Sequence, residues 1–467
     1  MNNKKKFIFN VSIALIAQLI SLLCNVGISL IFPKFLSVRE FAFWQLFAFY
    51  VGYVGLFHLG FNDGLYLKLG GKEFEEINKS LIKSEIATLF FIEFIIMIII
   101  SVIGILGNFE YERRFVIIST AIFLLVNNIW ACLGYIFQAV DHTRWYSTAI
   151  ILERIFFVFL FWGLVLLHQY DIRFLICIYI ISKIISLLFC IWKARPIWKA
   201  KFVPFNQAFP YFKSALRSGV FLMLANLSGT LILGIGRYVM DVRWGIEMFG
   251  KFSFANSLTQ FALVFICQFS MVMFPALRKE SDVNNQLIYR KLKKWLTNVG
   301  PFLYLLYLPV YVLISWWLPQ YQDSMKYMII LMPICLFDGK MNILFNTYFK
   351  VYNNEKKMFS INFFSVMCST LFAIMGAYIW ENEVLIIYGI VISIIIRSII
   401  AEKEVDKILN VFSENECMVD VIFTITFWGI FQSNLFNITT CAVLYFGVIL
   451  VGFGLIRILR RREKHDY

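Results

Sequence analysis

The sequence predicts an all-helical integral membrane protein that crosses the bilayer about fourteen times. Long apolar runs follow one another along the whole chain, and a helix of roughly twenty apolar residues is enough to span the hydrocarbon core. Hydrophobic residues make up 60% of the chain, and the mean hydropathy is +0.75. The runs are continuous and do not alternate with polar residues, so they favour helices over barrel strands.

The predicted spans and their short connections use up nearly all of the chain, which leaves no room for a soluble catalytic domain. The first span contains no charged residue and is too long for the core of a signal peptide. The predicted spans are 7–32, 41–61, 81–106, 115–138, 145–167, 174–192, 216–240, 250–275, 299–318, 325–349, 358–380, 383–400, 419–436 and 439–459.

Lys and Arg residues between the spans predict the orientation of the protein. If the N-terminus with Lys4, Lys5 and Lys6 is cytoplasmic, the cytoplasmic segments hold about thirty Lys and Arg residues, and the external loops, with the first residues of the spans that follow them, hold about eight. Such an excess marks the cytoplasmic side. An even number of spans returns the basic tail RILRRREK to that side. We expect a multi-pass protein of the bacterial plasma membrane with both termini in the cytoplasm.

The longest segment between spans, residues 193–217, divides the first twelve spans into two groups of six. Its lysines, prolines and aromatic residues suit a segment that lies on an anionic inner leaflet. A short repeat supports the division, because EFAFW opens span two and EMFGKF opens span eight. Two similar halves are common in transporters. The predicted parts are a six-helix lobe (1–195), an amphipathic cytoplasmic linker (196–215), a second six-helix lobe (216–410), and two added helices with a basic tail (411–467).

Composition and motifs exclude several functions. The net charge of +14 lies in loops between apolar spans and forms no basic face, so we expect no nucleic-acid partner. The nine cysteines form no CxxC pair and lie mostly within spans, where cysteine behaves as a small apolar residue. The sequence has no phosphate-binding loop, no G-x-S-x-G elbow and no histidine spacing typical of a metal site. We expect no cofactor, no metal and no enzymatic activity.

Charged residues inside the spans are the candidates for function, because they are costly in hydrocarbon. Arg154 and Lys183 each lie nine positions into their spans, roughly 14 Å deep. Lys340 is also deep, whereas Arg237 and Arg397 lie near span ends and could reach the headgroups. The acidic residues inside spans are candidates for ion coupling or charge pairing: Glu93, Glu153 and Asp338.

Two interpretations of these charges stay open. The charges either form interhelical ion pairs that fix the packing, or line a hydrated cavity whose cationic walls hold an anionic substrate. Glu153 and Arg154 are adjacent and point in different directions, so each needs another partner. Three asparagines at similar depth would suit either sugar hydroxyls or contacts between helices: Asn127, Asn128 and Asn226.

Four segments carry a resemblance to a known family: HLGFNDGLYLKLGG (58–71), YIFQAVDHTRWYS (135–147), the long segment 219–254, and LFDGKMNILFNTYFKVYNNEKK (336–357). In type, order and spacing they resemble the polysaccharide-unit flippases of bacterial O-antigen, capsule and teichuronic-type pathways. That family belongs to the superfamily of multidrug, oligosaccharidyl-lipid and polysaccharide exporters. The resemblance covers spans one to twelve.

The resemblance implies a V-shaped, MATE-like bundle of two six-helix lobes that works by alternating access. It also implies a substrate, an oligosaccharide unit on an undecaprenyl diphosphate carrier, that moves from the cytoplasmic to the outer leaflet. Cavity cations would hold the diphosphate, and by type and depth these are Arg154, Lys183, Arg237 and Lys340. The last two helices resemble a pair that flanks a lipid-facing groove in fourteen-helix members.

Two other functions stay open at this point. One is an ion-coupled multidrug or small-molecule antiporter of the same fold, for which an anionic cavity would be expected. The other is a membrane-embedded polysaccharide polymerase or glycosyltransferase, which would usually carry a sizeable external loop. For the flippase, the expected partners are the lipid-linked oligosaccharide, membrane lipids, and the polymerase and glycosyltransferases of the same pathway.

Overall fold

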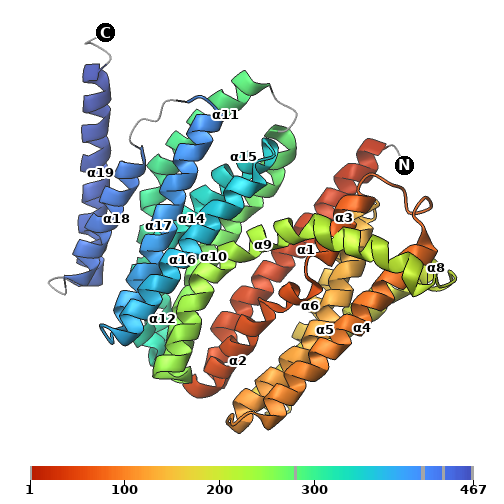
Figure 1. Cartoon of the computed structure of the whole chain (residues 1–467). Helices are drawn as coiled ribbons and strands as arrows, with labels where there is room; N and C mark the ends of the chain where they lie inside the picture. Colours follow the sequence, from red (N-terminus) through yellow and green to blue (C-terminus); the bar gives the residue numbers. More distant parts are fainter. Residues whose placement is uncertain (1–2, 278–280, 412–415, 434–436, 464–467) are drawn as a thin grey trace. The chain divides into compact units, whose positions relative to one another are not determined.

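The computed structural model describes residues 3–277, 281–411, 416–433 and 437–463, and within them every regular element is a helix (Figure 1). The all-helical fold class is therefore confirmed. The chain divides into two compact units, Met1–Leu227 and Ser228–Tyr467. One long helix, α9 (Phe205–Trp244), contains the point of division.

Long apolar helices that follow closely in sequence build unit 1. Besides the first part of α9, its elements are α1 (Asn3–Phe35), α2 (Val38–Val51), the 3₁₀-helix η1 (Val54–His58), α3 (Phe61–Leu69), α4 (Lys79–Leu106), α5 (Tyr111–Ala139), α6 (Thr143–Leu166), α7 (Ile172–Lys193) and α8 (Arg195–Trp198).

Polar residues directly before the helices of unit 1 fix where they begin. Ser37 and Glu40 form a capping box at the start of α2. Asn78 accepts a hydrogen bond from the backbone of α4, and Asp171 does the same for α7. Such caps satisfy backbone N–H groups that the first helical turn leaves without partners.

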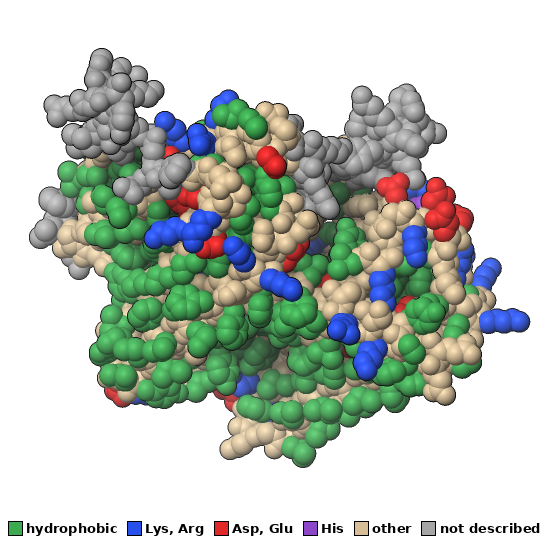
Figure 2. Space-filling view, turned by 45° about the horizontal axis from the view of Figure 1, so that its top comes forward, with side chains coloured by type: hydrophobic (Ala, Val, Ile, Leu, Met, Phe, Trp, Pro, Cys, Tyr) green, Lys and Arg blue, Asp and Glu red, His purple; other side chains and the backbone are tan. Residues whose placement is uncertain are grey.

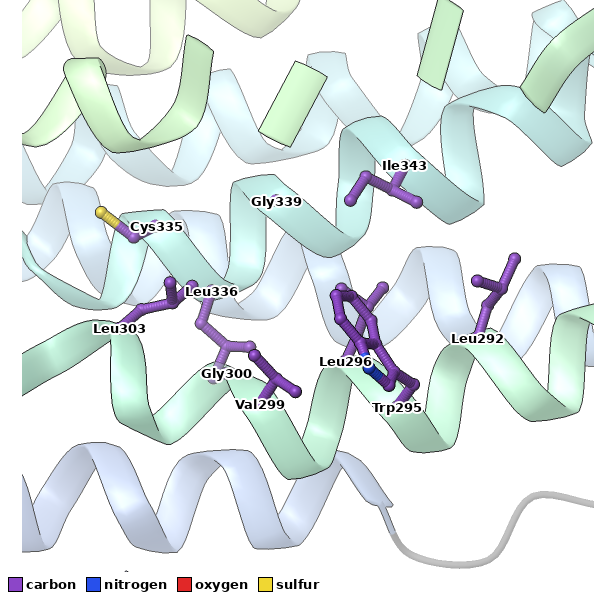
Figure 3. A pocket seen from close by; sticks show the side chains of 10 residues that line it. All are labelled: Leu292, Trp295, Leu296, Val299, Gly300, Leu303, Cys335, Leu336, Gly339 and Ile343. Atoms are coloured by element: carbon purple, nitrogen blue, oxygen red, sulfur yellow. The ribbon is translucent and has the colours of Figure 1, made fainter. Parts of the chain in front are cut away.

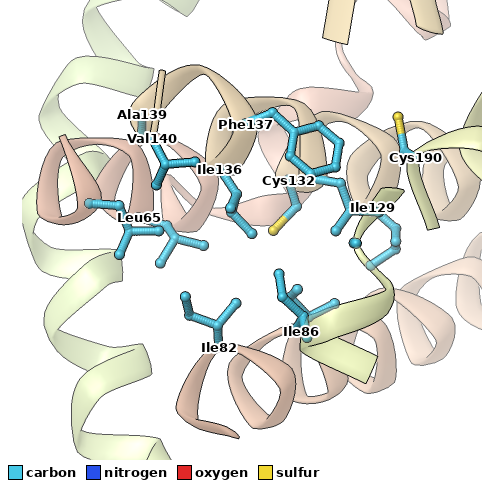
Figure 4. Close-up of a cluster of buried hydrophobic side chains, with 14 of the residues drawn as sticks. Leu65, Ile82, Ile86, Ile129, Cys132, Ile136, Phe137, Ala139, Val140 and Cys190 are labelled. Atoms are coloured by element: carbon cyan, nitrogen blue, oxygen red, sulfur yellow. The ribbon is translucent and has the colours of Figure 1, made fainter. Parts of the chain in front are cut away.

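A cluster of buried apolar side chains holds α3, α4 and α5 together (Figure 4). Ile82 and Ile86 of α4 face Cys132 and Ile136 of α5, with Leu65 of α3 beside them. All five side chains are almost completely buried. The same cluster includes residues of α7, α8 and α9, so the expected linker region packs on this unit.

The segment predicted as a linker is partly helical. It contains α8, a short non-helical stretch and the first turns of α9. Lys83 of α4 donates hydrogen bonds to the carbonyl oxygens of Trp198 and Ala200, both at 2.8 Å. Ser84 and Val203 exchange two further hydrogen bonds (2.8 and 3.2 Å). These bonds anchor the segment to the start of α4.

Unit 2 contains more interrupted helices. Besides the end of α9, its elements are α10 (Ile246–Leu277), α11 (Asp282–Val299), η2 (Gly300–Leu306), α12 (Tyr307–Trp317), η3 (Pro319–Ser324), α13 (Met325–Leu331), α14 (Pro333–Lys340), the π-helical turn η4 (Met341–Phe345), α15 (Asn346–Val351), α16 (Glu355–Tyr378), α17 (Glu383–Ile408), α18 (Glu416–Gln432) and α19 (Ile438–Glu463).

The helical path from residue 319 to residue 351 is bent by 43°. The bend lies at Pro333, which has no backbone N–H and so interrupts the helical hydrogen-bond pattern. A π-helical turn follows directly after Lys340, and such turns are frequent at functional sites. Lys340 therefore lies in an irregular part of an otherwise apolar helix.

In the part of the chain that the structure describes, ten helices are long and apolar enough to cross a membrane, or eleven if the bent path counts as one span. This result supports a multi-pass membrane protein, while the count of fourteen stays a prediction. Figure 2 shows broad hydrophobic areas on the visible surface, with Lys and Arg side chains in separate patches. The structure does not describe the side chains of the N-terminal lysines or of the basic tail, and His465 lies outside the described residues.

Candidate functional site

Within the helices of unit 1, Lys183 belongs to a buried ion pair. Its Nζ atom lies 2.6 Å from the carboxylate of Glu153, and both side chains are almost fully buried between α6 and α7. The same Nζ atom lies 3.6 Å from the centre of the Trp130 ring, close enough for a cation–π contact. Trp130 donates a hydrogen bond to Ser186 (2.8 Å), which fixes the ring. The arrangement is the one expected of an interhelical charge pair.

Arg154, next to Glu153, points elsewhere. Its guanidinium interacts with Tyr179 of α7 and lies near Cys24 of α1. Its Nε atom is buried and has no hydrogen-bond partner. In the described part of the chain, no carboxylate lies within ion-pair distance of this guanidinium. Lys183 is thus paired with a carboxylate, whereas Arg154 retains an N–H group that makes no hydrogen bond.

Glu93 of α4 is completely buried, with an exposed fraction of 0%. Neither carboxylate oxygen has a hydrogen-bond partner, although the side chain of Asn128 lies beside it. A polar group buried in this way needs a partner, a proton or an ion to offset its loss of hydration. Glu93 thus has the features expected of an ion-coupling residue.

The three asparagines proposed as sugar contacts lie in different surroundings. Asn128 is buried and donates a hydrogen bond to the Val54 carbonyl oxygen (2.9 Å), where it helps to hold η1 on α5. Asn127 is half-buried beside it. Asn226 of α9 is exposed. Of the three, Asn226 is the most accessible to a ligand.

A buried His58–Asp63 pair lies where α2 gives way to α3, within the segment HLGFNDG. The His58 Nε2 atom is 3.9 Å from the Asp63 carboxylate, and both side chains are about nine-tenths buried. Burial raises the pKa of the Asp63 carboxyl to about 6. The backbone N–H of Gly60 donates to His58 Nδ1 (3.0 Å), so the imidazole helps to hold the turn.

In unit 2, Lys340 also belongs to a buried pair. Its Nζ atom donates to the carboxylate of Asp420 and to the Thr297 hydroxyl, the latter at 2.6 Å. Lys340 and Asp420 are each 1% exposed. The pair joins α14 to α18, so it ties one of the last two helices to the rest of the unit. We missed Asp420 in the sequence because it falls at the start of a predicted span.

Arg397 and Asp338 form a second ion pair in this unit, between α17 and α14. The side chain of Arg397 is 5% exposed. The sequence suggested that Arg397 could reach the headgroups from a span end. That expectation is wrong, because α17 extends to Ile408 and places Arg397 near its middle. Asp338 thus takes part in charge pairing.

Arg237 of α9 contacts a hydroxyl group and an aromatic ring. Its Nε atom donates to the Ser253 hydroxyl (3.1 Å), and its guanidinium lies 5.1 Å from the centre of the Phe249 ring. Both partners belong to α10. The aromatic face and the hydroxyl thus hold the guanidinium against α10.

Sequence analysis missed a further charged cluster, around Lys293 of α11. Its Nζ atom lies 2.9 Å from Glu402 and 3.0 Å from Asp406, both of α17. Tyr289 donates a hydrogen bond to Asp406 (2.8 Å). The cluster was hidden because residues 276–294 were predicted as a loop. No group of three or more His, Cys, Asp or Glu side chains in the described residues is arranged to hold a metal ion.

An apolar groove lies between α11 and the path formed by α14 and η4 (Figure 3). Trp295 and Leu296 line one wall, and Leu336 and Ile343 line the other. No charged side chain lines the groove. It can accept hydrocarbon but offers nothing to a diphosphate or a sugar.

Comparison with protein families places most of the chain in one group. Residues 7–280 match the family described as polysaccharide biosynthesis protein, which is more than half of the chain. No curated protein matches the sequence.

Comparison with solved structures identifies relatives of the fold. The first is a lipid II flippase, MurJ, in an inward closed conformation, with a TM-score of 0.68 and 13% identity over 98% of this chain and 99% of that chain. The second is a multidrug-resistance MATE family transporter of the MOP superfamily, facing inward, with a TM-score of 0.59 and 14% identity over 86% of this chain and 98% of that chain.

A third similar structure is a MOP superfamily transporter from Pyrococcus furiosus, whose title describes a binding pocket of reversed polarity. It has a TM-score of 0.56 and 13% identity over 87% of this chain and 96% of that chain. At these identities the likenesses show the fold alone. They confirm the MATE-like architecture that the sequence motifs predict.

Proposed function

Because the chain belongs to the polysaccharide biosynthesis protein family, we propose that it is a flippase for undecaprenyl-diphosphate-linked oligosaccharide repeat units. It moves these units by alternating access from the cytoplasmic to the outer leaflet of the bacterial plasma membrane. There they supply the synthesis of a surface polysaccharide such as an O-antigen or a capsule. The family match over residues 7–280 carries the proposal, and the fold shared with a lipid II flippase supports it.

The chemistry of the substrate explains why such a protein needs a polar path and no covalent step. A diphosphate and a chain of sugars lose their hydration in hydrocarbon, so they cannot cross it unaided. Most of the polyprenyl chain can stay in the lipid. A protein that shields the headgroup during passage is enough, and we propose no enzymatic activity.

We assign the diphosphate first to Arg154, because its guanidinium has no carboxylate partner among the described residues. A guanidinium binds phosphate oxygens through two parallel hydrogen bonds. Arg237 offers the same group in unit 2. Lys183 and Lys340 could join only by exchanging their carboxylate partners for the substrate, which makes them secondary candidates.

The remaining polar candidates take supporting roles in this proposal. Glu93 is the candidate for ion coupling, since its buried carboxyl has no hydrogen-bond partner. Glu153 and Asp338 serve charge pairing. Asn127 and Asn226 remain candidates for sugar contacts, whereas the side chain of Asn128 donates a hydrogen bond to the backbone of η1.

The membrane potential can drive the proposed direction. Moving about two negative charges outward across a membrane potential of about 100 mV, inside negative, releases roughly 4–5 kcal/mol. A counter-ion cycle through Glu93 is an alternative source of energy. Either drive avoids ATP hydrolysis, for which the sequence has no phosphate-binding loop.

The experiment that tests the function combines deletion and reconstitution. Deletion of the gene should make a lipid-linked oligosaccharide accumulate on the cytoplasmic leaflet, and the purified protein in vesicles should move that lipid. A cationic dye such as ethidium serves as the rival cargo. Export of the dye with no movement of the lipid-linked sugar would instead support an antiporter of the same fold.

A further inference from the structure

An apolar groove runs along unit 1 between α1 and α6. Its empty volume is about 600 Å³ when the open space at its mouth is included, and no charged side chain lines it. The residues that matter for the argument are Cys24, Gly27 and Ile28 from α1, and Phe157, Val158 and Trp162 from α6. Such a lining excludes sugars and phosphates but suits a hydrocarbon chain.

Arg154 lies one helical turn before the part of α6 that lines this groove. Phe157 and Val158 follow it by three and four positions on α6, so all three share one face of the helix. Cys24, which lines the groove from α1, is close enough to Arg154 for an electrostatic interaction. The groove therefore leads along the helix to a guanidinium.

This guanidinium has a donor that makes no hydrogen bond. Its neighbour Glu153 is engaged by Lys183 at 2.6 Å, and the Arg154 Nε atom is buried without a hydrogen-bond partner. An apolar groove next to a cation that has no carboxylate within ion-pair distance in the described residues is complementary to a molecule with a long hydrocarbon chain and an anionic end. A diphosphate on a polyprenyl chain is such a molecule.

We propose that the groove between α1 and α6 holds the first part of the polyprenyl chain while Arg154 holds the diphosphate; this inference rests on the proposed function. In the predicted topology both helices run outward, and the groove lies on the external side of Arg154. The groove would therefore hold the chain in the outer half of the membrane, where the substrate is released. The protein would then have a binding site for the polyprenyl chain in addition to the one for the diphosphate.

The sequence offers a direct way to fill the groove. A Cβ atom at Gly27 would lie 3.8 Å from the Ile31 Cδ1 atom, an ordinary contact, so Gly27→Leu should fold and occupy the groove. Val158→Trp fills it from the opposite wall. Gly163→Leu is the matched control, since a Cβ atom there meets nothing within 4 Å and Gly163 does not line the groove.

The test measures binding of undecaprenyl diphosphate and of geranyl diphosphate to the full-length protein in detergent. Gly27→Leu and Val158→Trp should weaken undecaprenyl diphosphate binding about tenfold, because part of the chain stays exposed. The affinity for geranyl diphosphate should change by less than about twofold, because its short chain would occupy little of the groove. Arg154→Gln should weaken both ligands, and Gly163→Leu should weaken neither. Melting temperatures near that of the wild type would show that the variants are folded.

Three results would overturn the inference. Unchanged binding of undecaprenyl diphosphate by both filled variants would mean that the chain lies elsewhere. Equal weakening of both ligands would mean that the substitutions disturb Arg154. Displacement of undecaprenyl diphosphate by phosphatidylglycerol at equal concentration would make the groove a general phospholipid site. Failure of the proposed function looks different, because wild-type protein would then bind the diphosphate lipid and move no lipid-linked sugar in vesicles.

Discussion

At the scale of single residues, burial and pairing separate the charged side chains into two kinds. Lys183, Lys340 and Arg397 each face a buried carboxylate. Arg154 faces the Tyr179 hydroxyl and has no carboxylate within reach among the described residues. A buried pair is strongly destabilised when one partner is removed, whereas a cation without a carboxylate partner can be neutralised with less effect on the fold. This difference makes their roles experimentally separable.

The first prediction concerns the Lys183–Glu153 pair. Lys183→Met should destabilise the protein by about 3–5 kcal/mol, because it leaves a buried carboxylate without its cation. Adding Glu153→Gln should restore most of the lost stability, because no unpaired carboxylate then remains. Melting temperatures of the single and double variants check this, with exposed Lys213→Met as the control. A single variant as stable as the wild type would show that the pair has no structural role.

For Arg154 we predict the opposite pattern. Arg154→Gln should abolish transport of the lipid-linked sugar while the melting temperature stays within a few degrees, since no carboxylate is left unpaired. Arg154→Lys should keep part of the activity, because the charge remains but the planar pair of donors is lost. Transport assays in vesicles and thermal melts together measure both effects. Full transport by a stable Arg154→Gln protein would remove this residue from the site.

Asp63 gives a prediction about pH. Its pKa rises to about 6 in the folded protein from an ordinary value of 3.8, so the folded state binds more protons than the unfolded state between these values. Stability from this group is therefore present at low pH and is lost as the pH rises toward 6, by about 2–3 kcal/mol at most. Asp63→Asn should flatten that part of the stability profile. Parallel profiles for both proteins between pH 4 and 7 would contradict the raised pKa.

Sequence reasoning identified the midplane cations but not their partners. Arg154, Lys183 and Lys340 are visible because charge stands out in apolar runs. Pairing depends on which helices pack together and how they are turned, and a single sequence does not contain that information. Asp420 shows the limit, because it lies at the start of a predicted span and was not among the candidates, yet it is 1% exposed.

At the scale of helices, most predicted spans agree with observed helices to within a few residues. Residues 276–294 are the clearest exception, because Arg290, Lys291 and Lys294 make the segment too polar to resemble a span. It nevertheless forms α11 from Asp282 onward. These three charges are exposed, while Tyr289 and Lys293 are buried. An amphipathic helix satisfies its polar face in water, so average hydropathy underestimates it.

The crossing of α3 and α9 supports a prediction about glycine. A Cβ atom at Gly64 would lie 1.9 Å from the Ala215 carbonyl oxygen, and one at Gly219 would lie 2.0 Å from that of Gly60. Both obstacles are backbone, so Gly64→Ala should force the helices apart and destabilise the protein by about 1–3 kcal/mol. Thermal melts check it, with Gly163→Ala as a control that should be neutral or stabilising. An unchanged melting temperature for Gly64→Ala would mean that this contact is looser than the structure indicates.

At the scale of the whole molecule, the fold class and the orientation in the membrane are predicted from different features of the sequence. Apolar runs predict membrane helices directly, because hydrocarbon leaves the backbone no other way to satisfy its hydrogen bonds. Orientation follows from a statistical excess of Lys and Arg residues on one side. The direction of transport depends on the orientation, so the orientation needs an experiment of its own.

The last prediction tests the orientation separately in each unit, in a protein whose native cysteines have been replaced. Asn108→Cys in unit 1 and Asn382→Cys in unit 2 should react with a membrane-impermeant maleimide added to whole cells, because both positions are exposed and lie in predicted external loops. Lys199→Cys and Lys356→Cys, equally exposed but predicted to be cytoplasmic, should react only after the membrane is opened. Since each unit carries its own pair, an inversion of either unit would be visible. Labelling of Lys199→Cys in intact cells would reverse the assigned topology and, with it, place the groove between α1 and α6 on the side where the substrate enters.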